Sequence, residues 1–278
     1  MAKFVEAKKN LIELFKKNNI DLQEVNILFC EVLNCTKAEL MIKTDLSVAE
    51  QKKLNYAVKK RLEGMPIQKI FRRAYFYDLV LYINNNVLCP RPETELLVEE
   101  VLKTSNEKSK ILDLCTGSGA IALAIKRHTN AQVFASDISK KALYVAKKNA
   151  RNLNLQLKFF HSNMFDGIKQ KFDIIVSNPP YIKTEDCKML DVEVKNYDPI
   201  ISLDGGANGL KFYEIIAKDT PKHLTKTGKI VLEVGMGQAQ DVKKLLEKNG
   251  FVCYIKRDYN NIERVVVGEL KWLKNVIQ

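Results

Sequence analysis

A stiff segment rich in hydrogen-bond acceptors follows a predicted buried strand. The strand is Phe172–Ser177, and Asn178-Pro-Pro-Tyr181 stands at its carboxyl end. The prolines fix their φ angles and remove two backbone donors, which leaves the Asn178 side-chain oxygen and the Pro179 carbonyl as acceptors, with Tyr181 as a flat face. Two acceptors that hold the N–H bonds of a planar nitrogen can aim it at an electrophilic methyl group. Such chemistry depends on positioning rather than on a strong base.

A glycine-rich loop lies earlier, between a predicted strand at Ile111–Leu114 and a predicted helix at Gly119–Arg127. It contains G-x-G-x-x-A, whose glycines allow a tight turn and close approach of the backbone to a ligand. Asp137 ends the next predicted strand, 20 residues after Gly117, where an acid can accept hydrogen bonds from ribose hydroxyls. NAD and S-adenosylmethionine both contain an adenosine ribose, so the loop predicts a nucleotide-type cofactor without choosing between them.

The residue just before the loop favours S-adenosylmethionine. Asp113 would place a carboxylate near the cationic methionine portion of that cofactor, although it could equally cap the end of its strand. No further residue set for nicotinamide chemistry is present. The glycine loop could instead be a tight turn that binds no ligand. The Asn178–Tyr181 segment could instead be a simple Asn-Pro turn without a catalytic role.

The elements that must position these motifs form two predicted parts. The first part contains helices, one of which begins at the capping-box pattern Ser47-Val-Ala-Glu50 and ends near Glu63. A β-hairpin follows, with a turn at Asn84–Asn86, and Thr94 is expected to cap a helix over Glu95–Thr104. The predicted domains are a helical substrate-recognition domain at 1–70, the hairpin linker at 71–90 and a catalytic domain at 91–278.

After Lys110 the chain alternates between strand and helix patterns, which predicts an α/β fold with helices on both faces of a seven-stranded, Rossmann-like sheet. The predicted strands are Ile111–Leu114, Gln132–Ser136, Leu157–Phe160, Phe172–Ser177, Lys229–Val234, Phe251–Lys256 and Arg264–Gly268. The other predicted helices are Lys140–Asn152, Gly209–His223 and Gln238–Asn249. Ligands of such sheets bind at the carboxyl ends of the strands. Glu233-Val-Gly235, at the end of a later strand, is expected to support the core.

Composition excludes several classes of protein. The 278 residues are 46% hydrophobic and 28% charged, with a net charge of +12, so the chain is expected to be globular. The basic charge is compatible with nucleic-acid binding, but a solvated lysine-rich surface explains it at least as well. No window resembles a membrane span or a signal peptide, which predicts a cytoplasmic protein. Six scattered cysteines and three distant histidines predict neither a disulfide framework nor a metal site.

The chain resembles the protein-(glutamine-N5) methyltransferases of peptide chain release factors (the PrmC/HemK family), which are class I S-adenosylmethionine-dependent methyltransferases. The run Pro90-Arg-Pro-Glu-Thr-Glu95 discriminates most, because many nitrogen methyltransferases carry the Asn-Pro-Pro-Tyr segment without it. The other matching segments are Gly64-Met-Pro-Ile-Gln68, the glycine loop, Ser177–Ile182 and Leu203–Leu210. This resemblance covers nearly the whole chain.

The resemblance implies methyl transfer to the glutamine of the Gly-Gly-Gln motif in class I release factors. A monomer that needs no nucleic acid is expected. The implied substrate pocket is Asn178, Pro179, Pro180 and Tyr181, of which Asn178, Pro179 and Tyr181 are the catalytic candidates. The implied cofactor residues are Asp113, Cys115, Thr116, Gly117, Ser118, Gly119, Asp137, Met164 and Asn178. Cys115 replaces a glycine usual in the family, and Asn163-Met164 stand where an acid and a large aromatic residue are common.

Three alternatives stay open at the level of sequence. The first is an N-methyltransferase with another target, either a ribosomal-protein glutamine or the exocyclic amine of adenine in nucleic acid. The second is an NAD-binding oxidoreductase, and the third is a module that binds a release factor or the ribosome without catalysis. Segment 183–204 is either a lid over the substrate or a long connection.

Overall fold

The structure of the protein is a computed structural model that describes residues 2–271. Residue 1 and residues 272–278, at the outer ends of the predicted domains, lie outside the described residues. The chain divides into two compact units, one that ends at Arg73 and one that begins at Ala74.

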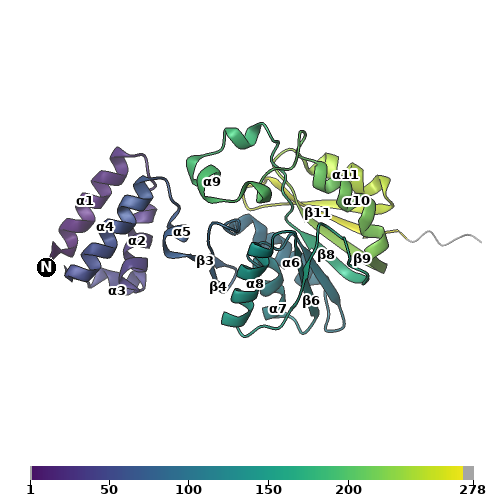
Figure 1. Cartoon of the computed structure of the whole chain (residues 1–278), viewed down its shortest axis with the longest axis horizontal. Helices are drawn as coiled ribbons and strands as arrows, with labels where there is room; N and C mark the ends of the chain where they lie inside the picture. Colours follow the sequence, from purple (N-terminus) through teal and green to yellow (C-terminus); the bar gives the residue numbers. More distant parts are fainter. Residues whose placement is uncertain (1, 272–278) are drawn as a thin grey trace, which may run out of the picture. The chain divides into compact units, whose positions relative to one another are not determined.

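The N-terminal unit is a small helical bundle with one short pair of strands, β1 and β2 (Figure 1). The predicted capping box of Ser47 with Glu50 is present, and Thr36 with Glu39 forms a second one. Apolar faces of the helices meet in a common core, in which the rings of Phe4 and Phe29 pack edge to face. Its elements are β1 (Ala2–Lys3), α1 (Phe4–Lys17), α2 (Gln23–Leu33), α3 (Lys37–Met41), β2 (Asp45–Leu46), α4 (Val48–Leu62) and α5 (Ile67–Phe71).

The predicted hairpin is present, but its turn is not where the sequence places it. Strands β3 (Arg73–Phe76) and β4 (Leu79–Tyr82) are joined at Tyr77 and Asp78, and Asn84–Asn86 forms a second turn after β4. Tertiary contacts hold the hairpin turn: the Tyr77 N–H donates to Glu95 Oε1 at 2.7 Å, and Asp78 lies 3.0 Å from His128 Nε2. These contacts accommodate Tyr77 at φ +57°, a conformation that an asparagine adopts more readily.

The C-terminal unit contains the predicted seven-stranded sheet, in the order β10-β11-β9-β8-β5-β6-β7. All neighbours are parallel except β11, which pairs antiparallel with β9 and β10. Its strands are β5 (Lys110–Leu114), β6 (Gln132–Asp137), β7 (Lys158–His161), β8 (Phe172–Ser177), β9 (Leu224–Glu233), β10 (Phe251–Arg257) and β11 (Glu263–Leu270). The strand order reverses between β5 and β8, which is where doubly wound sheets bind their ligands.

Helices cover both faces of this sheet, as predicted (Figure 1). On one face, α6 and α7 pack on Ile111 and Val133, while on the other α10 and α11 pack on Leu112 and Phe134. Neighbouring strand residues thus point to opposite cores, as the two-residue period of a strand requires. The helices are α6 (Glu95–Thr104), α7 (Ala120–His128), α8 (Lys140–Asn152), α9 (Val192–Tyr197), α10 (Lys211–His223) and α11 (Ala239–Lys248), with short 3₁₀ helices η1 (Pro92–Thr94), η2 (Asp186–Lys188) and η3 (Ile200–Ser202).

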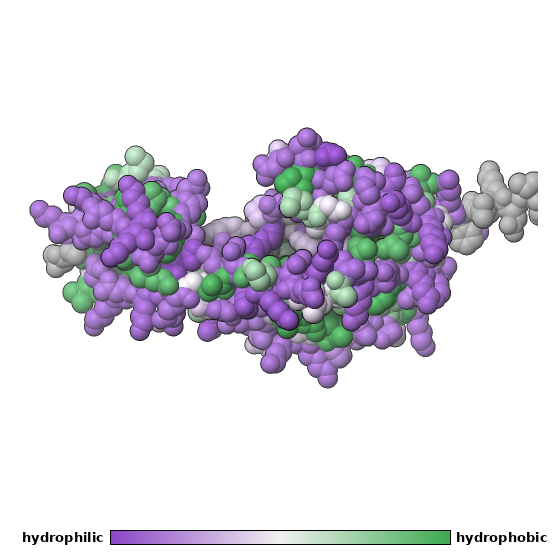
Figure 2. Space-filling view, turned by 90° about the horizontal axis from the view of Figure 1, so that it is seen from above, coloured by the Kyte–Doolittle hydropathy of each residue, from purple (hydrophilic) through white to green (hydrophobic). Residues whose placement is uncertain are grey.

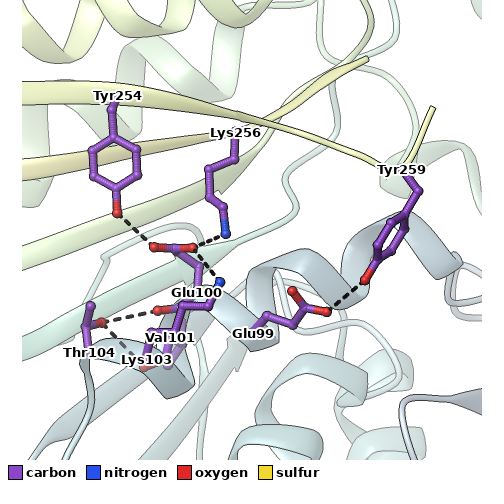
Figure 3. A network of polar contacts seen from close by, with 8 residues as sticks. All are labelled: Glu99, Glu100, Val101, Lys103, Thr104, Tyr254, Lys256 and Tyr259. Atoms are coloured by element: carbon purple, nitrogen blue, oxygen red, sulfur yellow. Dashed lines mark hydrogen bonds and ion pairs between the residues drawn. The ribbon is translucent and has the colours of Figure 1, made fainter. Parts of the chain in front are cut away.

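A buried polar network fastens α6 to β10 (Figure 3). Glu100, which is 5% exposed, accepts a hydrogen bond of 2.8 Å from the Tyr254 hydroxyl and is bound by the Lys256 ammonium group. Burial alone would raise the pKa of Glu100, but the bonds from Lys256 and Tyr254 outweigh it and lower the pKa. The network therefore fixes the helix that directly follows Thr94.

The surface is mainly hydrophilic on the face shown in Figure 2. Within the described part of the chain, no helix has the length and apolar character that would let it cross a membrane. Residues 2–271 also contain no group of three or more histidine, cysteine, aspartate or glutamate side chains arranged to hold a metal ion.

Candidate active site

The glycine loop joins β5 to α7 and has a strongly constrained backbone. Cys115, Gly117 and Gly119 have φ angles of +63°, +55° and +84°. A Cβ atom at Gly119 would lie 3.1 Å from the Ala146 side chain, so this glycine also permits close packing of α7 against α8. Cys115 is not a glycine, and a left-handed conformation costs such a residue about 1 to 2 kcal/mol.

Asp113 lies underneath the loop rather than in the space in front of it. Its side chain is fully buried, and Oδ2 accepts hydrogen bonds from the Thr116 hydroxyl at 2.5 Å and from the Ala122 N–H at 3.1 Å. These bonds tie the loop to the first turn of α7. Oδ1 is buried without a partner among the described residues. The loop, not the Asp113 carboxylate, therefore forms the surface next to a ligand.

Asp137 links the two segments that follow β5 and β6. Its Oδ2 accepts a hydrogen bond of 2.9 Å from the Gly117 N–H, and its Oδ1 accepts one of 2.8 Å from the Ser139 N–H. Burial raises the pKa of the Asp137 carboxyl, although both backbone bonds act in the opposite direction. The carboxylate is therefore held in a fixed position while it lines a cavity.

This cavity has a volume of about 380 Å³ and lies at the carboxyl ends of β5, β6 and β8. Such a volume is within the range of small-molecule sites. Six of the residues predicted from sequence line it: Cys115, Gly117, Asp137, Met164, Asn178 and Pro180. Thr116, Ser118 and Gly119 form the loop behind this wall, and Thr116 and Ser118 are both buried.

Further apolar residues that the sequence did not single out also line the cavity. They are Val87, Leu88, Ile201, Phe212 and Ile215. These side chains come from the segment after the hairpin, from η3 and from α10, so the cavity gathers residues from parts of the chain that are far apart. Periodicity alone marks such residues as core, and only the fold shows that they face an open space.

Met164 faces the glycine loop. Its sulfur lies 4.0 Å from the Cys115 sulfur, and its backbone has φ +51°. The Ser162 hydroxyl donates to the Met164 carbonyl oxygen at 2.8 Å, which holds this turn. The two residues that depart from the family pattern, Cys115 and Met164, are therefore direct neighbours, and their soft side chains fill the same part of the wall.

The Asn178-Pro-Pro-Tyr181 segment follows β8, next to the glycine loop that follows β5. Asn178 Nδ2 donates to Thr94 Oγ1 at 3.2 Å, which directs the amide oxygen away from Thr94. The prediction that Thr94 caps α6 through its side chain is wrong, because its hydroxyl makes no cap bond and serves Asn178 instead. Pro179 and Pro180 are buried.

Tyr181 is held by the loop between β9 and α11, which the sequence did not place in the site. The Gln238 side-chain amide donates to the Tyr181 carbonyl at 2.9 Å and accepts from the Gly235 N–H at 3.0 Å. Cβ atoms at Gly205 and Gly209 would lie 2.7 Å from Tyr181 Cα and 2.5 Å from its carbonyl oxygen. The sequence marked Leu203–Leu210 only as a segment that resembles the family. Its contact with Tyr181 depends on the tertiary structure, so the sequence could not show it.

Asn149 joins the hairpin to the glycine loop. It is fully buried on α8, donates to the carbonyls of Tyr82 and Ser118 at 2.9 Å each and accepts from the Tyr82 N–H at 2.7 Å. Asn149→Leu keeps a similar size but removes its hydrogen bonds to three backbone groups, one of which is buried and two of which are partly buried. We expect the free energy of unfolding to fall by about 3 kcal/mol in urea denaturation. Asn152→Leu, an exposed change on the same helix, is the control, and equal losses would contradict this role.

Glu233, at the end of β9, is a buried carboxyl beneath Tyr181, and burial raises its pKa to about 7. Thr94, Arg264 and Tyr181 lower this pKa, and Glu93 raises it further. Unfolded glutamate titrates near pH 4.3, so between about pH 4.5 and 7 the folded protein binds a proton that the unfolded chain has lost. The contribution of Glu233 to the free energy of unfolding of the wild-type protein therefore falls as the pH rises from about 4.5 to about 7.

Glu233→Gln removes this titration. We expect the variant to gain stability relative to wild type as the pH rises from about 4.5 to about 7, by at most about 1.4 kcal/mol per pH unit. Urea denaturation at several pH values measures the difference, and Glu214→Gln, at an exposed glutamate, is the control. A difference that is constant across this range would refute the assignment.

Segment 183–204 contacts the Pro90–Glu95 segment. Asp198 Oδ1 accepts from the Cys89 N–H at 3.2 Å, and its Oδ2 lies 3.8 Å from the Arg91 guanidinium. Pro199, Ile201 and Ser202 then line the cavity. The segment is thus part of the cavity wall rather than a bare connection.

A mostly parallel sheet with a glycine loop, an acid after the next strand and Asn-Pro-Pro-Tyr at the switch point is typical of a methyltransferase domain. A family model described as "Methyltransferase small domain" matches residues 92–194, and one described as "PrmC N-terminal domain" matches residues 6–71. The chain belongs to the release factor glutamine methyltransferase family.

Relatives of that name align with nearly the whole chain. The chain is 38% identical to the release factor glutamine methyltransferase of Thermodesulfovibrio yellowstonii, over 95% of this chain and 98% of the relative. It is 33% identical to that of Bacillus cereus, over 96% and 99%. Among solved structures, a methyltransferase from Pyrococcus furiosus matches with a TM-score of 0.53 at 18% identity, over 79% of this chain and 96% of that one, which shows a shared fold.

Proposed function

We propose that this protein methylates the side-chain amide nitrogen of a glutamine in class I peptide chain release factors, with S-adenosylmethionine as the methyl donor. The observation that carries the proposal is that Asn178 and Pro180 line the same cavity as Gly117 and Asp137. This shared cavity supports binding of a planar amide next to an adenosine-containing cofactor. The relatives of the chain are named for this activity.

The residues present fit S-adenosylmethionine. Asp137 would hold the ribose, the Cys115–Gly119 loop would lie along the methionine portion, and Met164 would contact the adenine. Apolar cavity residues such as Ile201 and Phe212 suit a flat heterocycle. Asp113 supports the loop from below. When bound, the cofactor supplies a methyl group made electrophilic by its sulfonium sulfur.

The protein contributes positioning. The Asn178 side-chain oxygen and the Pro179 carbonyl accept the two N–H bonds of the substrate amide, which aligns the nitrogen for direct displacement. Tyr181 covers one face of the amide. Burial raises the pKa of the Tyr181 hydroxyl above its ordinary value, so this group stays protonated and does not act as a base. The proton released from nitrogen passes to water, and the reaction needs no metal and no covalent intermediate.

The proposal also covers the partner, the assembly and the location of the enzyme. The N-terminal unit recognises the release factor, the enzyme works as a monomer without nucleic acid, and it acts in the cytoplasm together with its substrate. Glycines beside the target glutamine suit a narrow pocket, because a backbone without side chains can enter it.

The direct test is incubation of the protein with methyl-labelled S-adenosylmethionine and a release factor, followed by mass spectrometry. We expect a single added methyl group on the glutamine of Gly-Gly-Gln and none after substitution of that glutamine by alanine. Label that persists after the substitution, or that appears on ribosomal protein or nucleic acid instead, would refute the proposal.

A further inference from the structure

The orientation of the Asn178 carboxamide decides whether it can bind a substrate amide. The oxygen and nitrogen of an asparagine side chain have nearly the same shape, so hydrogen-bond partners select between the two orientations. The proposed function requires the oxygen to face the substrate, because a primary amide offers two N–H donors. Asn178 Nδ2 is directed toward Thr94 Oγ1, at 3.2 Å.

The Thr94 hydroxyl oxygen is placed to accept this hydrogen bond rather than to donate one to the Asn178 side-chain oxygen. Thr94 is 5% exposed, and its hydroxyl lies near enough to the Glu233 carboxyl group, which is 3% exposed, to lower the pKa of that carboxyl. A hydroxyl has one proton to donate, and once the pH exceeds the Glu233 pKa of about 7, the ionised carboxylate can only accept. When the Thr94 proton is directed to Glu233, the Thr94 oxygen can only accept, so it selects the N–H side of Asn178.

Glu233 also reaches the other end of the substrate pocket. Its Oε1 lies 3.4 Å from the Tyr181 hydroxyl, and its Oε2 is buried without a hydrogen-bond partner among the described residues. The charge of Arg264, which pairs with Asp258, lowers the Glu233 pKa. The Tyr213 hydroxyl donates to the Glu233 carbonyl at 2.8 Å, which fixes the backbone at this point. One buried carboxylate is thus connected to two of the four residues of the Asn-Pro-Pro-Tyr segment.

We propose that Thr94 and Glu233 form a buried relay that fixes the Asn178 carboxamide with its oxygen toward the substrate amide. The relay rests on the proposed function and assigns a role to Thr94 of the Pro90–Glu95 segment. Both are positioning residues, since each acts through Asn178. The Glu100 network (Figure 3) holds α6, and with it Thr94, at the required place.

The test uses the full chain and single-turnover methylation of a release factor. Thr94→Val keeps the shape of the side chain but removes the hydroxyl, and we expect the rate to fall by about 10- to 100-fold. Affinity for S-adenosylmethionine, measured by calorimetry, should change by less than about twofold, because Thr94 does not line the cavity. Thr94→Ser should restore most of the rate, and Thr104→Val, at the exposed far end of α6, should have no effect.

The decisive comparison repeats Thr94→Val in an Asn178→Ala background. If Thr94 acts through Asn178, the second change should alter the rate by less than about twofold. The full loss in that background, or a wild-type rate in Thr94→Val alone, would overturn the relay. Should thermal melting show that Thr94→Val is unfolded, Glu233→Leu replaces it, because leucine cannot accept the Thr94 proton, with the same expected loss and the same dependence on Asn178.

The two proposals fail in different ways. A wild-type protein that binds S-adenosylmethionine but does not methylate the release factor would refute the proposed function. A wild-type protein that methylates it, combined with independent effects of Thr94 and Asn178, would refute the relay alone.

Discussion

Asn178→Ala is expected to lower kcat for release-factor methylation by about 100- to 1000-fold, the range seen when one preorganised hydrogen-bonding group is removed from an active site. The substrate amide would lose one of its two acceptors and could rotate, so that its nitrogen is no longer aimed at the methyl group. Affinity for S-adenosylmethionine should fall by less than about tenfold, because Asn178 is one of many cavity residues.

Rates with labelled cofactor, together with calorimetry, separate these two effects. Asn130→Ala is the matched control, because Asn130 is exposed and bonds only with Glu107 among the contacts of its side-chain amide. Thermal melting should show similar stability for both variants. A normal kcat in Asn178→Ala would mean that another group orients the amide, and the proposed mechanism would have to be abandoned.

Gly209→Ala is expected to damage both stability and activity. Gly209 is buried with φ +75°, and a Cβ atom there would lie 2.5 Å from the Tyr181 carbonyl oxygen and 2.6 Å from Gln238 Nε2. The overlap with a backbone atom can be relieved only if Tyr181 moves. We expect the free energy of unfolding to fall by about 3 kcal/mol or more and kcat to fall by about 100-fold.

Gly167→Ala is a sharp control for this prediction. Gly167 has almost the same φ, +74°, but a Cβ atom there would meet nothing within 4 Å. Backbone strain alone should cost it about 1 to 2 kcal/mol, with kcat unchanged. Urea denaturation and steady-state rates measure both variants. Equal effects of the two changes would show that strain, rather than displacement of Tyr181, explains the loss.

Much of the fold could be predicted because its signals are local. The strand patterns from Ile111 to Gly268 and the helices between them reflect burial on two faces, and hydrophobic periodicity records burial directly. The capping box at Ser47 is equally local, since its bonds span three residues. The hairpin turn was misplaced because Glu95 and His128 hold it, and both lie far along the chain.

Some features of the candidate site could likewise be predicted from local sequence, and others depend on the tertiary structure. Spacing along the chain places the Cys115–Gly119 loop and the Asn-Pro-Pro-Tyr segment at the ends of strands. Spacing says nothing of strand order, and only the β5–β8 pairing makes these segments neighbours. Asp113 was expected to face the cofactor, but the bonds from Thr116 and Ala122 hold its carboxylate beneath the loop.

The sequence by itself determined the kinds of chemical groups and the strand ends that carry them, because residue type and hydrophobic periodicity are properties of short segments. Only the tertiary structure decided that Thr94 and Asn178 meet, since 84 residues separate them and no local pattern encodes that approach. The orientation of the Asn178 carboxamide also depends on the tertiary structure, because its partner is Thr94. A hydrogen bond has a direction, and a partner supplied by another strand or helix fixes it.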